Sequence, residues 1–380
     1  GVYQGKAYEY CAGYQYHDKT IVGFSHTHMS GTGHSDLGDI LIMPTTGPLK
    51  LNPGTSDNPD SGYRSRFTHD TEKAAPGYYE VKLDDYGVKV QLTATQRVGV
   101  HKYTFPVDKE GRIVLDLNHS IYNYEGKTLW ATLRVENDTL LTGYRITNGW
   151  ARTNYTYFAI SLSQPIKNYG YKDHQRILYN GWWRKFPINN NFPEMAGRKL
   201  VSYFEFDTSR NPELVVKVAL SATSTEGALK NLQAEAVSKS FEMIASEASD
   251  NWKRQLASIE IQGTKDQQVM FYTSYYHTMI NPSVYMDVDG KYRGLDHNIH
   301  QAKGFTNYTI FSLWDTYRAE HPLLMLMKPN EATDMVKSMI KHQQQSVHGL
   351  LPVWSHMAND NWCMSGYHST SVLTDAITKG

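Results

Sequence analysis

The sequence predicts an N-terminal antiparallel β-sandwich, then a helical linker, then helices of an all-α toroid that is present only in part. Short segments that alternate apolar and polar residues fill the chain up to about Ser221. An apolar stripe with helical spacing follows, and beyond Gly263 helices dominate, joined by loops rich in Trp, His and Asp. We therefore expect a sandwich domain at 1–222, a helical linker at 223–262 and the N-terminal part of a catalytic helical barrel at 263–380.

The composition indicates a two-domain protein with a neutral ligand. A chain of 380 residues exceeds one ordinary domain. Its 38 Lys and Arg balance its 38 Asp and Glu, so the sequence shows no basic surface for nucleic acid. No apolar run approaches the roughly 18 residues of a membrane span. Aromatic faces from 27 Tyr and 8 Trp suit sugars, although they also fill cores.

The strand candidates share an alternation of apolar and polar residues, as half-buried strands do. Gly87 supplies a hairpin turn between the first two of them. We expect Trp182–Lys185 at a sandwich edge that the linker helix covers, in preference to an exposed aromatic patch. The candidates are Tyr78–Leu83, Val88–Leu92, Ile113–Leu117, Thr128–Val135, Thr156–Leu162, Leu200–Phe206 and Leu214–Leu220.

The helix candidates carry boundary signals as well as periodicity. Thr223-Ser224-Thr225-Glu226 matches a capping box, and a long apolar stripe from Leu229 to Leu256 follows it. Pro282 stops the next helix, and Lys379-Gly380 ends the last. The further helix candidates are Asp266–Ile280, Leu323–Met327, Glu331–Gln345 and Ser369–Thr378.

The stretch from Gly23 to Pro44 is the first candidate site. It is a glycine-punctuated loop that leads into an apolar run expected to form a buried strand ending at Pro44. The polar residues of the loop are His26, His28, His34, Asp36 and Asp39. The spacing of His26 and His28 suits a metal site, but residues two apart on a strand also share a face for hydrogen bonds to sugar hydroxyls. A tight turn whose histidines satisfy backbone groups is the plain alternative.

Trp314, Asp315 and Arg318 form the sharpest cluster of the helical half. An aromatic platform, a carboxylate and a guanidinium can stack on a sugar ring and bridge its hydroxyls. The alternative is an Asp–Arg pair at the start of a helix, with the tryptophan in the core.

Trp354, Asp360 and Trp362 belong to a second cluster, in an interhelix segment that we expect to line a wet cleft. Asp360 is a candidate general acid or base, metal ligand or N-cap.

Four segments resemble glycoside hydrolase family 92, the calcium-dependent exo-acting α-mannosidases. They are Tyr8–Pro44, Tyr63–Val81, Leu313–Leu324 and Gly349–Gly380. The resemblance implies a β-sandwich joined through helices to an (α/α)6 barrel, with the active site at their interface. It also implies an inverting reaction, in which one carboxylic acid protonates the departing oxygen and a second carboxylate activates water. Calcium in this family contacts the mannose.

The resemblance implies substrate binding by His26, His28, Trp314, Asp315 and Arg318, and we expect the same role for Trp354, Asp360 and Trp362. Asn361 departs from the Asn-Glu-Thr sequence of many members, which puts an acidic role there in doubt. The acid, the base and most calcium ligands are expected beyond Gly380, in a continuation or a second chain. This chain alone is therefore expected to be inactive.

The implied substrate is a glycan of the N-glycan or mannan type with a terminal α-linked mannose, α-1,2 in the first place. The implied location is periplasmic, secreted or at the cell surface. Three rivals stay open: a non-catalytic carbohydrate-binding module, a zinc-dependent hydrolase using His26 and His28, and a phosphorylase or lyase on the same barrel.

Overall fold

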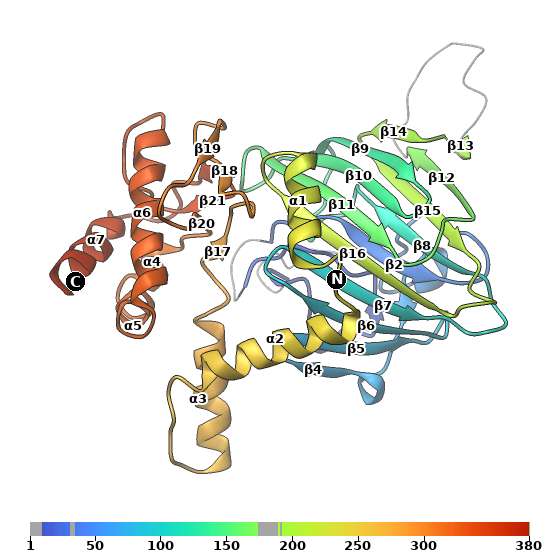
Figure 1. Cartoon of the computed structure of the whole chain (residues 1–380), viewed down its shortest axis with the longest axis horizontal. Helices are drawn as coiled ribbons and strands as arrows, with labels where there is room; N and C mark the ends of the chain where they lie inside the picture. Colours follow the sequence, from blue (N-terminus) through green and yellow to red (C-terminus); the bar gives the residue numbers. More distant parts are fainter. Residues whose placement is uncertain (1–9, 31–34, 174–188, 191, 380) are drawn as a thin grey trace.

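The computed structural model describes residues 10–30, 35–173, 189–190 and 192–379, and shows a large β-sandwich followed by a smaller helical domain (Figure 1). This order confirms the predicted fold class, with the helical barrel present in part. His34 and the segment Trp182–Lys185 lie outside the described residues. Within the described ranges, no helix is long and apolar enough to cross a membrane.

The sandwich consists of two antiparallel sheets. The larger has nine strands, in the spatial order β14 (Glu194–Gly197), β9 (Thr128–Asn137), β10 (Leu140–Thr147), β11 (Asn154–Leu162), β16 (Glu213–Ser221), β7 (Val98–Thr104), β6 (Val88–Ala94), β5 (Tyr78–Leu83) and β4 (Lys73–Ala75). The smaller has five, in the order β13 (Asn189–Asn190), β12 (Asn168–Asp173), β15 (Leu200–Phe206), β8 (Gly111–Asp116) and β2 (Leu41–Thr45). A separate pair joins β1 (Thr20–Ile21) to β3 (Ser65–Arg66).

The sandwich core lies between these two sheets. Val81 and Val90 of the larger sheet and Ile113 and Phe204 of the smaller are fully buried in one apolar cluster. The period-two alternation of the sequence produces this core, because every second side chain of a strand points to the same face.

The strand that follows the histidine loop differs from the prediction at its end. β2 continues through Pro44 to Thr45. Proline lacks a backbone N–H, so it is tolerated only where no neighbouring strand needs that donor. β2 is the edge strand of the smaller sheet and pairs with β8 on one side only.

The predicted long linker helix is two helices, α1 (Thr225–Glu235) and α2 (Phe241–Leu256). Ser224 caps α1, since its side chain accepts from the Gly227 N–H, and Ser240 caps α2. The expected capping box at Thr223 is therefore wrong by one residue. The apolar stripe was misleading because both helices bury residues against the outer face of the larger sheet.

The helical domain contains α3 (Lys265–His277), α4 (Leu313–Thr316), α5 (Glu320–Met327), α6 (Pro329–Gln345) and α7 (His368–Lys379). Helices α5, α6 and α7 pack on one another around Phe311, Leu324 and Met339, whereas α3 lies apart from them, next to α2 (Figure 1). Three short strand pairs complete the domain within the described residues: β17 (Ser283–Val284) with β20 (Tyr308–Thr309), β18 (Lys291–Arg293) with β19 (Ile299–Gln301), and β21 (Ser355–His356) with β22 (Asn359–Asp360). Of these, β21 and β22 form the hairpin that faces the sandwich.

The buried Asp287 carboxylate joins the sandwich, the linker and the helical domain. Its oxygens accept hydrogen bonds from the hydroxyls of Ser221 at 2.8 Å and Thr223 at 2.5 Å, and from the Asn231 amide at 2.8 Å. Ser221 ends β16, Asn231 lies in α1, and Asp287 precedes β18. One side chain thus fixes three elements relative to one another.

Candidate functional site at the domain interface

The histidine loop is an irregular antiparallel ribbon. Phe24 bridges Ile42 and His28 bridges Leu37, and the His26 N–H donates to the Asp39 carbonyl at 2.9 Å. Leu37, Gly38 and Ile40 have φ values of +68°, +90° and +55°. Positive φ is unfavourable for a β-branched residue such as Ile40. The resulting bends aim the buried Asp36 and Asp39 side chains inward.

Backbone strain gathers where this loop meets the helical domain. Ile310, Met357, Ala358, Trp362 and Met364 also have positive φ, between +46° and +72°. Ile310, Met357 and Leu37 belong to one apolar cluster, which joins residues of the sandwich to residues of the helical domain. Such conformations persist only where the surroundings over-determine them, and they concentrate at functional sites.

His26 is held in a directional chain of hydrogen bonds. Its Nδ1 lies 2.7 Å from the Ile40 carbonyl oxygen, so this nitrogen carries the proton and donates. Its Nε2 then accepts from His101 Nε2, 2.8 Å away, and His101 Nδ1 accepts from the Tyr103 hydroxyl at 2.6 Å. Burial lowers the pKa of His26 to about 4. Because both ring nitrogens are occupied, a sugar hydroxyl or a metal ion finds no free nitrogen on His26.

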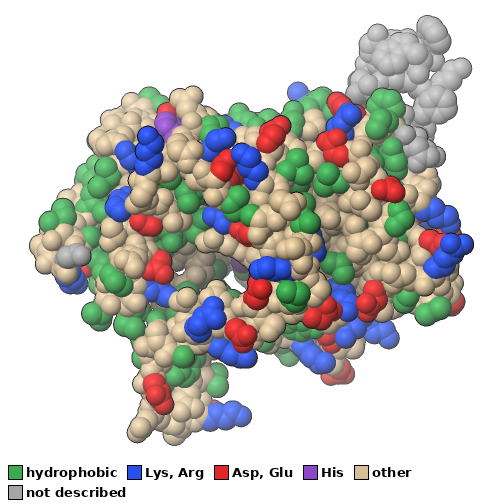
Figure 2. Space-filling model, in the orientation of Figure 1, with side chains coloured by type: hydrophobic (Ala, Val, Ile, Leu, Met, Phe, Trp, Pro, Cys, Tyr) green, Lys and Arg blue, Asp and Glu red, His purple; other side chains and the backbone are tan. Residues whose placement is uncertain are grey.

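His28 is exposed, and its Nδ1 lies 2.7 Å from the Met29 carbonyl oxygen. With His26 it lines a pocket of about 440 Å³ between the sandwich and the helical domain, which also contributes Asn281, Tyr285 and Met357. Figure 2 shows the surface hollowed between these two parts. The pocket has the size of an ordinary ligand site, roughly 300–1,000 Å³.

Asp39 is fully buried and structural. Its oxygens lie 2.7 Å from the Thr27 hydroxyl and 3.2 Å from Arg145 Nε. Arg145 also donates to Ser120 Oγ at 2.7 Å. Asp39 therefore anchors the loop to the sandwich.

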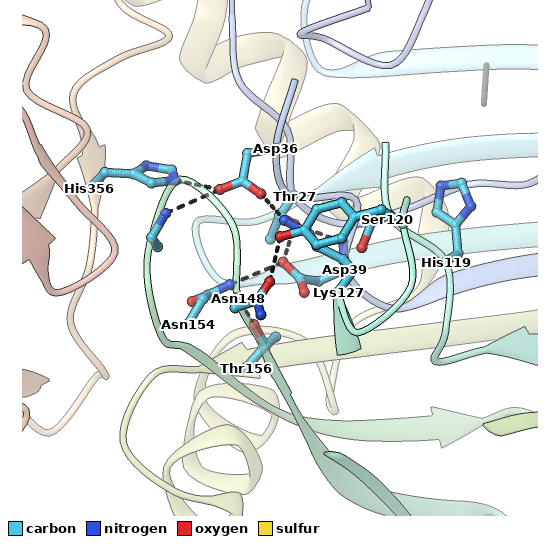
Figure 3. A network of polar contacts seen from close by, with 12 residues as sticks. Thr27, Asp36, Asp39, His119, Ser120, Lys127, Asn148, Asn154, Thr156 and His356 are labelled. Atoms are coloured by element: carbon cyan, nitrogen blue, oxygen red, sulfur yellow. Dashed lines mark hydrogen bonds and ion pairs between the residues drawn. The ribbon is translucent and has the colours of Figure 1, made fainter. Parts of the chain in front are cut away.

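Asp36 joins the sandwich to the helical domain (Figure 3). It accepts hydrogen bonds from Lys127 Nζ, from His356 Nε2 at 3.2 Å and from the Ala151 N–H at 3.4 Å. Burial alone would raise the pKa of this carboxyl, but the His356 hydrogen bond and the Lys127 charge outweigh it and hold the pKa well below its usual range. The Asp36 side chain is therefore an ionised link, not a proton donor.

The hairpin segment of the helical domain is organised by Asp360. Its two carboxylate oxygens accept from the backbone N–H groups of Val353 at 3.0 Å, Trp354 at 3.1 Å and Trp362 at 3.0 Å. Trp354 stacks on Trp150 of the sandwich with ring centroids 4.5 Å apart. The structure thus brings Trp354, Asp360 and Trp362 together in one loop that packs on the sandwich.

Trp314, Asp315 and Arg318 lie in a separate group at α4. The Arg318 guanidinium lies 5.8 Å from the Trp314 ring centre and 5.3 Å from that of Tyr317. All three predicted residues are exposed, and Asp315 accepts a hydrogen bond from the Ser312 hydroxyl. The structure thus brings the three predicted side chains to one exposed part of the helical domain.

Sequence reasoning missed several residues of the interface. Burial, together with the Asp315 charge, raises the pKa of Glu320 to about 7, so this carboxyl carries a proton near neutral pH. Its position two residues after Arg318 was the available signal. Lys127, His101 and Trp150 gave none, because their roles depend on contacts with distant segments.

The predicted metal sites would need groups of His, Cys, Asp or Glu side chains. Across the described residues, no group of three or more His, Cys, Asp or Glu side chains is arranged to hold a metal ion. The loop carboxylates Asp36 and Asp39 are each engaged by protein donors.

Comparison with known proteins agrees with this architecture. Residues 2–221 match the glycosyl hydrolase family 92 N-terminal domain, and residues 227–380 match the glycosyl hydrolase family 92 catalytic domain. Together the two matches cover nearly the whole sequence. The chain belongs to glycoside hydrolase family 92.

Solved structures of this family share the fold. A family 92 α-mannosidase from Bacteroides thetaiotaomicron is 40% identical, with a TM-score of 0.90 over 98% of this chain and 49% of its own. The same enzyme has been solved in complex with mannoimidazole. A family 92 inverting mannosidase from that species is 28% identical, with a TM-score of 0.82 over 97% of this chain and 46% of its own.

A curated relative from Arthroderma benhamiae, described as an uncharacterized secreted glycosidase, is 25% identical over 332 residues. These residues are 80% of this chain and 40% of the relative. The chain thus spans about half the length, or less, of the proteins it matches.

Proposed function

We propose that this protein is an exo-acting, inverting α-mannosidase that removes terminal α-linked mannose, α-1,2-linked in the first place, from N-glycan or mannan-type chains. The observation that carries the proposal is its membership of glycoside hydrolase family 92, with 40% identity to an α-mannosidase over 98% of the chain. The relative at 28% identity that is described as inverting supports the stereochemical part.

We assign terminal-mannose binding to the exposed group of Trp314, Asp315 and Arg318. The indole face suits the apolar side of a pyranose, and the carboxylate and guanidinium suit its hydroxyls. We assign further substrate contacts to Trp354 and Trp362 of the hairpin segment. Asp360 acts by holding that segment, since its two oxygens are already engaged by three backbone donors.

An inverting reaction needs two carboxyl groups about 6.5–9.5 Å apart, with room for a water molecule. Asp36, Asp39 and Asp360 are each engaged by protein donors and do not supply this pair. We propose that the acid and the base lie beyond Gly380, in a continuation or a second chain.

Calcium dependence belongs to the same proposal. Calcium would contact the mannose hydroxyls, a chemistry for which it prefers oxygen ligands. We place most of its ligands beyond Gly380, together with the acid and the base.

Export from the cytoplasm, to the periplasm, the cell surface or the medium, is also part of the proposal. The secreted glycosidase from Arthroderma benhamiae supports it. Cell fractionation of a tagged protein tests it, with the protein expected outside the cytoplasmic fraction.

The test is the release of free mannose from α-linked mannobioses by the full-length protein, before and after EDTA, with calcium then added back. We expect release that chelation abolishes and calcium restores. Mannoside binding without release would favour the non-catalytic carbohydrate-binding module. Restoration by zinc alone would favour the zinc hydrolase, although the engaged nitrogens of His26 do not support that reading.

A further inference from the structure

A second pocket, of about 430 Å³, lies on the sandwich side of the Asp36–His356 contact. It is lined by Ser35, Asp36, Tyr122, Tyr124, Lys127, Gly149 and Trp150. These residues come from three segments of the sandwich, and they include none of the substrate-binding residues expected from the sequence. The pocket is thus distinct from the group of Trp314, Asp315 and Arg318.

Aromatic rings form its walls. The rings of Tyr122 and Tyr124 lie 5.5 Å apart at an interplanar angle of 53°, and 40% of Tyr124 is exposed. The Tyr124 hydroxyl donates to the Asn148 side chain, which fixes the direction of the ring. Trp150 forms a further wall, and its ring stacks on that of Trp354. Rings in fixed orientations at a pocket wall favour the apolar face of a pyranose.

The floor carries the buried ammonium group of Lys127. The Lys127 side chain is only 2% exposed. Within the described ranges, its Nζ has one hydrogen-bond acceptor, an Asp36 oxygen (Figure 3). It lies 5.7 Å from the Tyr124 ring centre. An ammonium group has three protons to donate. A ligand oxygen in the pocket would accept from a Lys127 proton that has no acceptor among the described residues.

The charge of the floor selects a neutral ligand. Lys127 and Asp36 together carry no net charge, and an anion that approached Lys127 would also meet the Asp36 carboxylate. Gly149 keeps the floor open, because a Cβ atom there would lie 2.1 Å from Lys127 Nζ and 2.6 Å from Asp36 Oδ1.

We propose that this pocket is a subsite for a neutral hexopyranose unit of the glycan, the part that follows the terminal mannose. The sugar ring lies against Tyr122 and Tyr124, and one of its hydroxyl oxygens accepts from Lys127 Nζ. The Trp150 ring at the pocket wall stacks on Trp354, so the pocket adjoins the hairpin segment of the helical domain. The inference rests on the proposed function, because it takes the ligand to be a mannose-containing glycan.

The experiment is calorimetric titration of the full-length protein with an S-linked α-1,2-mannobiose, which resists hydrolysis, and with methyl α-mannopyranoside. We expect Tyr122→Ala to weaken mannobiose binding about tenfold, in keeping with one lost aromatic contact, and methyl mannoside binding less than twofold. Tyr122→Phe, which keeps the ring, should bind like the wild type. Tyr16→Ala removes a 63% exposed tyrosine that lines neither pocket and serves as the control.

The Lys127 contact is tested by the double variant Lys127→Met/Asp36→Asn, which leaves no unpaired charge in the floor. We expect it to weaken mannobiose binding about tenfold as well, through the lost charged hydrogen bond. Unchanged binding in both variants, no measurable mannobiose binding by the wild type, or tighter binding of mannose 6-phosphate than of methyl mannoside would each overturn the inference.

The assay of mannose release separates this inference from the proposed function. If the wild type releases mannose and Tyr122→Ala binds mannobiose as the wild type does, the subsite is refuted and the proposed function stands. If Tyr122→Ala binds mannobiose more weakly and the wild type releases no mannose, the subsite is supported and the mannosidase proposal is refuted.

Discussion

His356 Nε2 lies 3.2 Å from Asp36 Oδ2, across 320 residues of sequence and across the boundary between the sandwich and the helical domain. Both side chains are buried, and the second Asp36 oxygen is held by Lys127. Buried ionic contacts of this kind fix an arrangement more than they stabilise it, since desolvation offsets much of their attraction.

Removal of one partner should be strongly destabilising. Asp36→Ala leaves Lys127 charged, buried and unpaired, so we expect a loss of about 3–5 kcal/mol in the free energy of unfolding. Urea denaturation measures it. The control is Glu194→Ala, which breaks the exposed pair with Arg134 and should change stability by about 1 kcal/mol or less. Equal losses in the two variants would contradict a buried pair at Asp36.

The histidine chain should make the sandwich acid-sensitive. Burial lowers the pKa of His26 to about 4 and that of His101 well below its ordinary value, while Asp39 opposes the shift at His26. As the pH falls, the unfolded state binds the proton at a higher pH than the folded state does, because the histidine pKa is about 6.5 in the unfolded state and lower in the folded state. Its contribution is therefore complete above about pH 6.5 and is lost as the pH falls towards 4.

We expect His26→Gln to flatten the pH dependence of stability in that window by up to about 1.4 kcal/mol per pH unit, the value for one proton. Thermal or urea unfolding between pH 4 and 7 measures it. His28→Gln is the matched control, since His28 is exposed. An identical pH dependence in wild type and His26→Gln would refute a neutral buried imidazole.

Gly227→Ala should destabilise the protein although alanine is the better helix former by about 1 kcal/mol. Gly227 lies in the first turn of α1, and a Cβ atom there would come within 2.4 Å of Asp287 Oδ2 and 2.6 Å of Ser221 Oγ. The Asp287 contacts must then shift, at a cost of about 1–3 kcal/mol. Gln233→Ala, at an exposed position of the same helix, should be nearly neutral. A stabilised Gly227→Ala variant would contradict tight packing around the Asp287 carboxylate.

Asp360 offers a choice between catalysis and architecture. If Asp360 acts by accepting from three backbone N–H groups, Asp360→Ala should lose about 1–3 kcal/mol of stability, together with activity. Asp360→Asn should then keep part of both. A general acid or base would instead lose about 10²–10⁴ in kcat in Asp360→Asn with stability unchanged. Mannose release and urea unfolding, measured on both variants of the full-length protein, decide between them.

The strands could be located from the sequence because their signal is local. Tyr78–Leu83 and Leu200–Phe206 match β5 and β15 at both ends. Alternation over six or seven residues depends on which face of the strand meets the core, and the chain carries that pattern itself. The linker was harder, because an apolar stripe continues across the break between α1 and α2 at Ala236–Ser240.

The sequence by itself also determined the residue types of the site, a loop rich in histidine and aspartate and two tryptophan clusters. Only the tertiary structure decided what those residues touch: His26 meets His101, Asp36 meets Lys127 and His356, and Asp360 holds its own loop. The physical reason is range. A hydrogen bond needs its two groups within about 3 Å, and for residues as much as 320 positions apart that distance is set by the packing of two domains, which no local pattern records.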